Sequence, residues 1–441
     1  MKIVEGFQKG KALLSRQPAA AFYSVSPTLK ARIEKVFGQE LTPEDAVRRI
    51  LDDVQTNGDA ALRDYTSRID GVVPSSFEVS LKQLKAAYRE VSPELVSALR
   101  LAARRIRSFH VAQKRKLSSK FVRPGLGWLV RPLERVGLYV PGGTASYPST
   151  VLMTAVPAKV AGVKEIILTT PPSAKGEIPA ATLVAADIAG VDHVFRLGGA
   201  QAIAALAYGT ESVPKVDKIC GPGNIFVVLA KKLVYGTVDI DSLPGPSEVL
   251  IIADDTANPE YCASDLLAQA EHDAMASAIL VTPSRKLADA VNKEVEKQLH
   301  TLSRRPIATE ALESHGMIIV VSHVEQAFEL ANLYAPEHLC LMIENAQNNL
   351  DRVQNAGCII AGRNATVALS DYIAGPSHVL PTGGTARFGS PLNVSDFLKL
   401  IDIVNADQTD LKELGRAAAI IARAEGLEAH ARAVERRMKD S

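Results

Sequence analysis

The chain has almost no net charge, no long apolar run and few cysteines, and each of these absences argues against a class of protein. Its 50 Lys and Arg residues stand against 49 Asp and Glu residues, which leaves a formal net charge of +1. Basic residues gather only in short groups near 103–120 and 432–439, so we expect no nucleic-acid partner. No run of 18 apolar residues occurs, and we therefore expect no membrane-spanning helix.

Secretion and disulfide bonding are not indicated either. The first ten residues, MKIVEGFQKG, lack the basic and then apolar layout of a signal peptide, so we expect a cytoplasmic protein. The chain has four cysteines and no CxxC spacing. This usage does not indicate a disulfide framework or a structural zinc ribbon, and we expect reduced thiols.

The order of patterns along the 441 residues indicates an α/β protein with helical ends. Residues before about 130 read as mostly helical, and Thr42-Pro43-Glu44 and Ser92-Pro93-Glu94 are good helix starts. From about residue 135, short β-branched runs alternate with Ala-rich helical stretches over more than 200 residues. This alternation predicts two layered units with parallel sheets.

Three predicted strands end in glycine-rich turns, at residues 139–143, 196–201 and 220–224. In a parallel sheet such turns lie at the carboxyl edge, where the backbone can approach a ligand and the next helix N-terminus favours an anionic group. A nucleotide phosphate would fit there, although the glycines could also serve chain reversal alone. The complete Rossmann fingerprint and the Walker A motif are both absent.

Four of the nine histidines stand in informative contexts: His272, His338, His378 and His430. Gln269 and His272 have the i, i+3 spacing that places two possible metal ligands on one helix face, although glutamine is a weak ligand for zinc. Glu337 and His338 would form an acid–base pair if a local turn made by Pro336 aimed both into one cleft. The alternative is a helix-end glutamate beside a partly buried histidine.

Two further pairs lie late in the chain. Asp371 and His378 fall in a loop rich in Gly, Pro and Ser, a composition that often carries site residues. Glu425 and His430 flank Gly426, where a histidine is more commonly just solvated. The candidate ligands span some 160 residues, so their spacing does not join them into a local metal motif.

Eight motifs together resemble the histidinol dehydrogenase family, in family order and over essentially the whole chain. They are RVGLYVPGG, RLGGAQAIAALAYGT, ICGPGN, LPGPSEVLIIADD, LLAQAEHD, YAPEHL, DYIAGPSHVLPTGGTARF and AEGLEAH. The resemblance implies two Rossmann-like, aldehyde-dehydrogenase-like domains with helical terminal segments. We expect an N-terminal segment 1–35, one domain of 36–134 plus 245–390, an NAD-binding domain 135–244 and a C-terminal dimerisation segment 391–441.

The resemblance also implies an activity: oxidation of L-histidinol to L-histidine through histidinal, by two NAD-dependent hydride transfers at one zinc site. The implied zinc ligands are Gln269, His272, Asp371 and His430. The implied acid–base pair is Glu337 with His338, and the implied NAD contacts are Tyr139, Gln201 and Asn224. The implied substrate contacts are Ser247, Gln269, His272, His338, Asp371, His378, Glu425 and His430. In the family dimer, the C-terminal segment of one subunit completes the zinc site of the other, so His430 is expected to serve the partner.

Three alternatives remain at this point. A paralogue of the same fold would oxidise another alcohol, such as a sulfonated diol, although His378 and Glu425 favour a substrate that carries an imidazole. A non-catalytic zinc-binding protein would need the loss of Glu337 or His338, and both are present. A covalent route through Cys262 is disfavoured because helical geometry puts that residue about 10 Å along the axis from Gln269.

Overall fold

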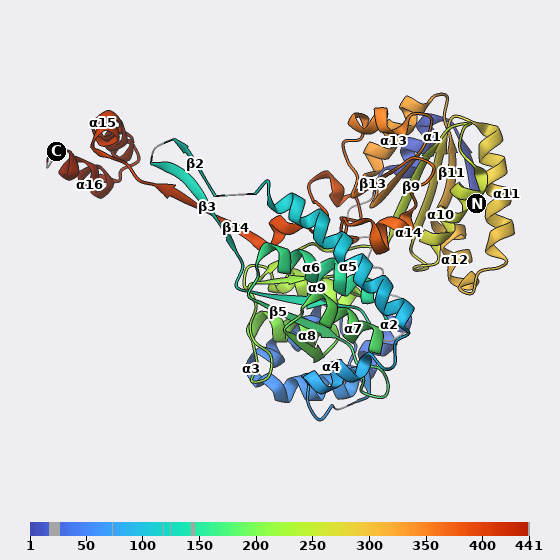
Figure 1. Cartoon of the computed structure of the whole chain (residues 1–441), viewed down its shortest axis with the longest axis horizontal. Coiled ribbons are helices and arrows are strands. Elements are labelled where there is room, and N and C mark those ends of the chain that lie inside the picture. Colours follow the sequence, from blue (N-terminus) through green and yellow to red (C-terminus); the bar gives the residue numbers. More distant parts are fainter. Residues whose placement is uncertain (17–26, 73, 118, 124, 143–145, 440–441) are drawn as a thin grey trace.

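The computed structural model describes residues 1–16, 27–72, 74–117, 119–123, 125–142 and 146–439, which form two rounded bodies and a projecting arm (Figure 1). One body contains the N-terminus and a sheet formed by residues 2–5 together with strands from residue 248 onward, and the other is built around residues 135–240. None of the helices in the described part combines the length and the apolarity that a membrane span requires.

A parallel six-stranded sheet is the centre of the first body, in the order β1-β11-β10-β9-β12-β13. Its strands are β1 (Lys2–Glu5), β9 (Glu248–Ala253), β10 (Ser277–Thr282), β11 (Gly316–Val320), β12 (His338–Met342) and β13 (Cys358–Ala361). Every residue of β9 and β12 is buried, as expected for central strands of a sheet covered on both faces. One face packs against α10 (Pro259–Ala270), α11 (Arg285–Leu299), α12 (Arg305–His315) and α14 (Val367–Leu369), and the other against α1 (Phe7–Leu14), α13 (Val324–Tyr334) and η2 (Ala346–Arg352).

The second body contains a parallel five-stranded sheet in the order β6-β5-β4-β7-β8. Its strands are β4 (Arg135–Tyr139), β5 (Glu165–Thr170), β6 (His193–Arg196), β7 (Lys218–Cys220) and β8 (Asp239–Ile240). One face packs against α4 (Leu81–Ala87), α5 (Pro93–Lys114), α6 (Pro148–Ala161) and α7 (Ala180–Ala189), and the other against α3 (Pro43–Asp70), α8 (Gly199–Tyr208) and α9 (Ile225–Val234). Helix α2 (Pro27–Phe37) packs on α3. Two parallel sheets between helical layers confirm the predicted fold class.

The helices between residues 43 and 114 pack on a different sheet from the one we expected. The expectation grouped residues 36–134 with 245–390, whereas Val47 and Ile50 of α3 share a core with α8 and α9, and Ile106 of α5 packs against α6. The expected N-terminal helical segment also begins with a strand, because β1 pairs with β11. Helical periodicity shows which face of a helix is apolar but not which sheet that face will cover.

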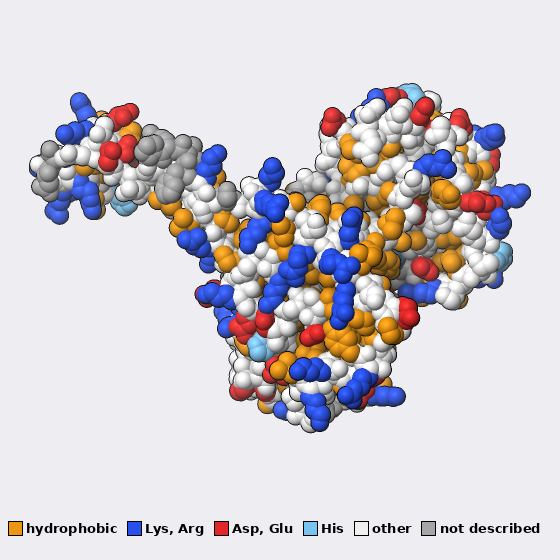
Figure 2. Space-filling view, in the orientation of Figure 1, with side chains coloured by type: hydrophobic (Ala, Val, Ile, Leu, Met, Phe, Trp, Pro, Cys, Tyr) orange, Lys and Arg blue, Asp and Glu red, His pale blue; other side chains and the backbone are white. Residues whose placement is uncertain are grey.

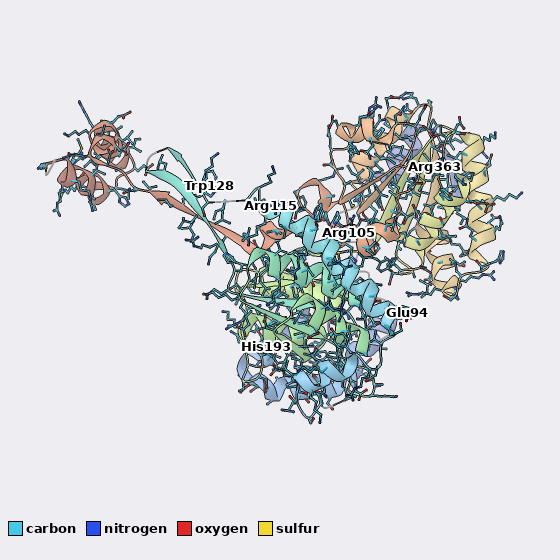
Figure 3. All side chains as sticks on the ribbon, in the orientation of Figure 1. Glu94, Arg105, Arg115, Trp128, His193 and Arg363 are labelled. Atoms are coloured by element: carbon cyan, nitrogen blue, oxygen red, sulfur yellow. The ribbon has the colours of Figure 1, made fainter. Side chains whose placement is uncertain are left out.

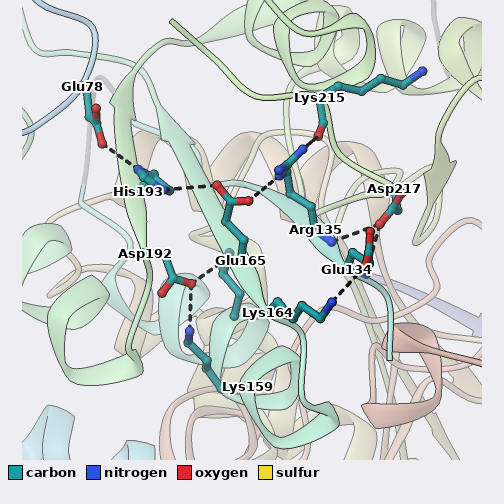
Figure 4. A network of polar contacts seen from close by, with 11 residues as sticks. Glu78, Glu134, Arg135, Lys159, Lys164, Glu165, Asp192, His193, Lys215 and Asp217 are labelled. Carbon is teal, nitrogen blue, oxygen red and sulfur yellow. Dashed lines mark hydrogen bonds and ion pairs between the residues drawn. The ribbon is translucent and has the colours of Figure 1, made fainter. Parts of the chain in front are cut away.

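Ion pairs close the amino edge of the five-stranded sheet (Figure 4). His193 at the start of β6 lies 2.7 Å from Glu78 and 3.3 Å from Glu165 at the start of β5. The other oxygen of Glu165 accepts a hydrogen bond of 2.5 Å from Arg135, where β4 begins. Asp217, just before β7, accepts from the Arg135 amide at 3.0 Å. These contacts connect four strand starts and leave the carboxyl edge as the place for the glycine-rich turns.

The arm is a three-stranded antiparallel sheet that ends in two helices. It consists of β2 (Lys120–Arg123), β3 (Leu126–Pro132), β14 (Leu398–Val404), α15 (Gln408–Ala424) and α16 (Glu428–Lys439). Trp128 lies on it, far from the six-stranded body (Figure 3). The side chains of Leu400, Val404 and Ile420 are 66%, 78% and 59% exposed. Large apolar side chains exposed on several elements of one projection indicate an interaction surface.

Candidate functional site

Most of the predicted site residues meet at the amino edge of the six-stranded sheet, where it faces the second body. His338 is the first residue of β12 and pairs in register with Val249 of β9, and Ser247 directly precedes that strand. Helix α10 follows β9 and runs back along the sheet, so its C-terminal end, with Gln269, returns to the same edge. The catalytic, substrate and metal candidates of this body are therefore neighbours despite their separation in sequence.

Glu337 and His338 point into one site, as the sequence required of an acid–base pair. The chain leaves α13 through Ala335, whose φ of 52° is left-handed, and this turn with Pro336 reorients the next two residues. Oε2 of Glu337 lies 3.8 Å from Nδ1 of His338. The two residues are only 7% and 3% exposed, so their charges are poorly screened and interact strongly.

Asp371 joins this pair from the π-helix η3 (Ser370–Ala374). Its Oδ1 lies 3.0 Å from Nε2 of His338, and its carbonyl oxygen accepts a 2.9 Å hydrogen bond from Nδ1 of His378. Because that contact places the proton of His378 on Nδ1, its Nε2 accepts from the Thr150 hydroxyl of α6 at 3.2 Å. His378 therefore joins the two bodies at the site.

The pKa values in this cluster depart from their ordinary ranges. Burial raises the pKa of Glu337 to about 7, against the charge of His338 and the amide hydrogen bond from Glu248. Burial alone would lower the pKa of His338, but the hydrogen bond to Asp371 and the charge of Glu337 raise it to about 9. Burial would also raise the pKa of Asp371. The hydrogen bond to His338 and the charge of His338 outweigh burial and keep the pKa of Asp371 below its usual value. Proton exchange near neutral pH is thus open to the pair.

Gln269 and His272 have the properties that a cation site requires. Gln269 is 1% exposed, and its Oε1 has no hydrogen-bond partner among the described residues. His272 follows the end of α10, where crowding by protein atoms lowers its pKa and keeps the imidazole neutral. An unpartnered amide oxygen, a neutral imidazole and the nearby Asp371 carboxylate form a donor set that suits a divalent cation. Within the described residues there is no group of three or more His, Cys, Asp and Glu that could hold a metal.

A cavity of about 820 Å³ opens beside His272 between the two bodies, and the corresponding hollow is visible in Figure 2. Helix α5 and the start of α6 line one side, and His272, Arg304 and Tyr372 line the other. The cavity has room for a small substrate beside the site.

The described residues of the three glycine-rich turns come together at the carboxyl edge of the five-stranded sheet; residue 143 of the first turn lies outside the described residues. The Tyr139 hydroxyl, at the end of β4, accepts a 3.2 Å hydrogen bond from the Gly199 amide at the start of α8. Asn224 caps α9, and Gln201 is fully buried with no partner for either amide atom among the described residues. A cavity of about 160 Å³ lined by Gly199, Asn224 and Arg32 adjoins them.

Gly221 shows why the third turn needs glycine. Its φ is 115°, and a Cβ atom there would lie 2.0 Å from the carbonyl oxygen of Tyr139. The close approach of β7 and β4 at their carboxyl ends is therefore open only to glycine. These strands flank the point where the strand order reverses, the usual position of a ligand in such sheets.

Glu425 and His430 are not brought to this site within the chain. Both are exposed, and they lie at the end of α15 and in α16, on the arm that projects from the bodies (Figure 1). Cys262 lies in the site body, but its thiol is fully buried against the Met342 sulfur at 3.3 Å, and burial raises its pKa to about 12. A thiol in that state is a poor nucleophile.

The structure adds three polar residues to the site that sequence reasoning missed: Asp265, Thr150 and Glu248. Asp265 lies one turn before Gln269 on α10 and is 5% exposed, with one carboxylate oxygen unpartnered among the described residues. Burial raises its pKa to about 6. The signal available was a carboxylate inside the apolar helix stretch 259–270, four residues before Gln269. Thr150 and Glu248 carried no local signal.

Comparisons with known proteins agree with one another. The family model described as histidinol dehydrogenase matches residues 37–438. The histidinol dehydrogenase of Dehalococcoides mccartyi strain CBDB1 is 55% identical over 439 residues, and that of Deinococcus radiodurans is 51% identical over 445, each covering 100% of both chains. A crystal structure of histidinol dehydrogenase from Elizabethkingia anophelis superposes with a TM-score of 0.90 at 36% identity, covering 100% of this chain and 98% of that one.

Proposed function

Because the chain belongs to the histidinol dehydrogenase family of oxidoreductases, which act in histidine biosynthesis, we propose that it oxidises L-histidinol to L-histidine with NAD and zinc. The observation that carries the proposal is the buried cluster of Glu337, His338 and Asp371 beside the Gln269 amide. It combines a proton-transfer pair with residues suited to bind a cation, one of which, His272, lines a cavity. A homologous paralogue acting on a sulfonated diol is not favoured by relatives at 51–55% identity.

Gln269, His272 and Asp371 would hold the zinc ion, with His430 supplied by the arm of a second subunit. The ion supplies a fixed point that orients the nitrogen atoms of the substrate. Ser247, His378 and Glu425 would complete the contacts with substrate. His378 is suited to this role because the Asp371 carbonyl and Thr150 already fix the orientation of its ring.

His338 would take the proton that the carbinol hydroxyl loses as hydride leaves the neighbouring carbon. In the neutral tautomer that donates Nε2–H to Asp371, the lone pair stands on Nδ1, facing Glu337. If Asp371 also held the zinc ion, its negative charge would be shared, and Asp371 would favour the protonated form of His338 less. The imidazole would then be better able to accept a proton at physiological pH.

Glu337 would act in the second oxidation. The first step yields an aldehyde, one reduced nicotinamide and one proton. The aldehyde must then add water: the Glu337 carboxylate takes a proton from that water as its oxygen bonds to the carbonyl carbon, and the carbonyl oxygen gains a proton in return, which gives the gem-diol. Loss of a second hydride to another NAD yields the carboxylate, a second reduced nicotinamide and two further protons. A carboxyl with a pKa of about 7 is suited to take and return a proton at this stage.

NAD would lie at the carboxyl edge of the five-stranded sheet and supply the hydride acceptor. Tyr139, Gln201 and Asn224 would contact NAD. The adjoining cavity, which is lined mostly by apolar side chains and by the positively charged Arg32, could hold part of the NAD molecule. The fully buried amide of Gln201 supports this placement because it has no partner among the described residues. We further propose a cytoplasmic homodimer in which the exposed apolar side chains of the arm pack on the partner. We also propose domain borders that follow the two sheets, with the helices of residues 43–114 in the body of the five-stranded sheet.

Turnover by the purified protein tests the proposal directly. With zinc, NAD and L-histidinol, we expect two NADH formed for each histidinol consumed. His338→Asn should slow turnover by about 100-fold or more while folding is retained. No turnover of histidinol, together with turnover of another alcohol, would transfer the proposal to the paralogue, and full activity of His338→Asn would remove the assigned base.

A further inference from the structure

Arg16, directly after α1, makes a buried ion pair with a residue 232 positions away. Its Nη1 and Nη2 donate to the two carboxylate oxygens of Glu248 at 2.6 and 2.7 Å. Its Nε donates to the Tyr334 carbonyl oxygen at 2.7 Å, and its guanidinium lies 3.9 Å from the centroid of the Tyr334 ring. The side chains of Arg16 and Glu248 are 14% and 4% exposed. A parallel two-bond pair with this burial has a defined geometry as well as a strong attraction.

Both partners of Arg16 border Glu337. Tyr334 ends α13, and the left-handed Ala335 follows it on the way to Glu337. Glu248 begins β9, and its backbone amide donates to Oε2 of Glu337 at 2.8 Å. The carboxylate of Glu248 also accepts from the Gly383 amide at 3.3 Å. Arg16 thus ties together the two segments that aim the Glu337 carboxylate at His338.

We propose that Arg16 is a positioning residue for Glu337, acting through Glu248 and the Tyr334 carbonyl. The inference rests on the proposed function, since it assumes that Glu337 moves protons in the reaction. Within the part of the chain that the structure describes, Arg16 does not line the cavity beside His272, and its contacts are with Glu248 and Tyr334 rather than with a proposed ligand of zinc or NAD. Arg16 fixes the direction of the Glu337 carboxylate and neutralises the negative charge of the neighbouring Glu248.

The charges of Arg16 and Glu248 should affect the pKa of Glu337, an effect that a loss of protein stability alone would not produce. The charged or titratable groups that act on Glu337 are His338, Glu248 and Asp371. The negative charge of Glu248 raises the pKa of Glu337, and Arg16 neutralises that charge at hydrogen-bond distance. Removing Arg16 leaves the negative charge of the Glu248 carboxylate near Glu337 without its counter-charge. Removing the charge of Glu248 leaves the positive charge of the Arg16 guanidinium without its counter-charge. The two substitutions should therefore shift the ionisation of Glu337 in opposite directions.

The test compares Arg16→Met and Glu248→Gln by their pH profiles with histidinol and NAD. For Arg16→Met we expect kcat to fall by about ten-fold or more with KM for histidinol changed less than about two-fold. The ascending limb of its kcat profile should move to higher pH, and that of Glu248→Gln to lower pH, each by about half a unit. Arg16→Lys keeps the positive charge but loses the two-pronged guanidinium. The ascending limb of its kcat profile should lie close to that of the wild type, whereas its kcat should recover only in part.

Arg285→Met is the matched control, because Arg285 also ties the N-terminal segment to the same body, through an ion pair with Glu5 remote from the site. It should leave kcat and the pH profile unchanged. Unshifted limbs in both Arg16→Met and Glu248→Gln would overturn the inference. If Arg16→Met fails to fold, the inference is still tested by the position of the ascending limb in the kcat profiles of Glu248→Gln and Arg16→Lys. A fully active Glu337→Gln enzyme would instead remove the role of Glu337 in the proposed function.

Discussion

At the scale of single residues, the site is marked by buried polar atoms that lack partners. Gln269 Oε1, His338 Nδ1 and Asp265 Oδ2 are all buried and unpartnered among the described residues, and all belong to α10 or to the start of β12. Unpartnered buried polar atoms destabilise a fold, and they concentrate where a substrate, ion or water is to be bound. These three unpartnered atoms are therefore expected to lower the stability of the fold and to be available for binding a ligand.

Asp265→Asn should stabilise the protein at neutral pH. The folded-state pKa of Asp265, about 6, is above its ordinary 3.8, so the folded protein binds the proton more tightly than the unfolded chain does. For such a group, stability decreases as pH rises through this window and the cost is complete above it. The amide avoids that cost, so the free energy of unfolding should rise by about 2–3 kcal/mol near pH 7.5 and hardly change near pH 4. Urea unfolding of both proteins at both pH values measures this, and an equal effect at the two values would contradict it.

At the scale of elements, the turn after β7 is held by a fully buried lysine. Nζ of Lys231, in α9, donates to the Gly221 carbonyl oxygen at 3.0 Å and pairs with Asp241. The other oxygen of Asp241 accepts from the Gly221 amide at 2.7 Å. The pair therefore satisfies both peptide groups of a left-handed glycine at the predicted NAD edge. A turn fixed in this way can present Asn224 without reorganisation.

Lys231→Met should loosen this turn and leave Asp241 as an unpaired buried charge. We expect a loss of about 3–5 kcal/mol in the free energy of unfolding, because the surviving carboxylate keeps two backbone hydrogen bonds but loses the lysine charge that neutralised it. We also expect a higher KM for NAD, with KM for histidinol unchanged. The neighbouring Lys232 is exposed and pairs with Glu44 at 3.5 Å, so Lys232→Met is the matched control and should change neither quantity. An unchanged KM for NAD in folded Lys231→Met would separate this turn from the cofactor.

At the scale of the whole molecule, the arm separates one predicted zinc ligand and one predicted substrate contact from the other predicted site residues. Glu425 caps α15 and His430 lies in α16, on the arm in Figure 1, while Gln269 belongs to α10, Asp371 to η3, and His272 lines the cavity that α5 and α6 also line. The apolar side chains exposed along the arm provide a surface for a second copy of the chain. A site shared between two subunits fits both observations.

Mixing two inactive variants tests whether the site is shared. His430→Ala and His338→Asn should each be nearly inactive as homodimers. In a mixed dimer, the body of the His430→Ala chain would receive an intact arm from its partner. After unfolding and refolding together in equal amounts, about a quarter of the wild-type activity should return. Chains carrying both substitutions, mixed with wild type in the same way, form the control for subunit exchange. No regain in the first mixture would show that His430 does not serve the partner's site.

Local sequence was enough for the class of fold, and it singled out most of the residues that the structure brings to the candidate site. The caps of α3 and α5, at Thr42 and Ser92, and the glycine-rich turns depend on neighbours a few residues away. Alternating strands and helices predicted the two parallel sheets, and motif order identified the family. The grouping of residues 36–134 could not be predicted in this way, because helices that pack on either sheet have the same apolar periodicity.

The sequence alone therefore established the chemistry available to this protein: which residue types stand at strand ends, turns and helix ends, and which family they resemble. Folding established which of them act together. His338 meets Asp371 across 33 residues, His378 meets Thr150 across 228, and Arg16 reaches Glu248 across 232. Contacts at these separations depend on how two sheets and their helices pack, and no short-range pattern encodes that packing. The same packing leaves His430 outside its own chain's site.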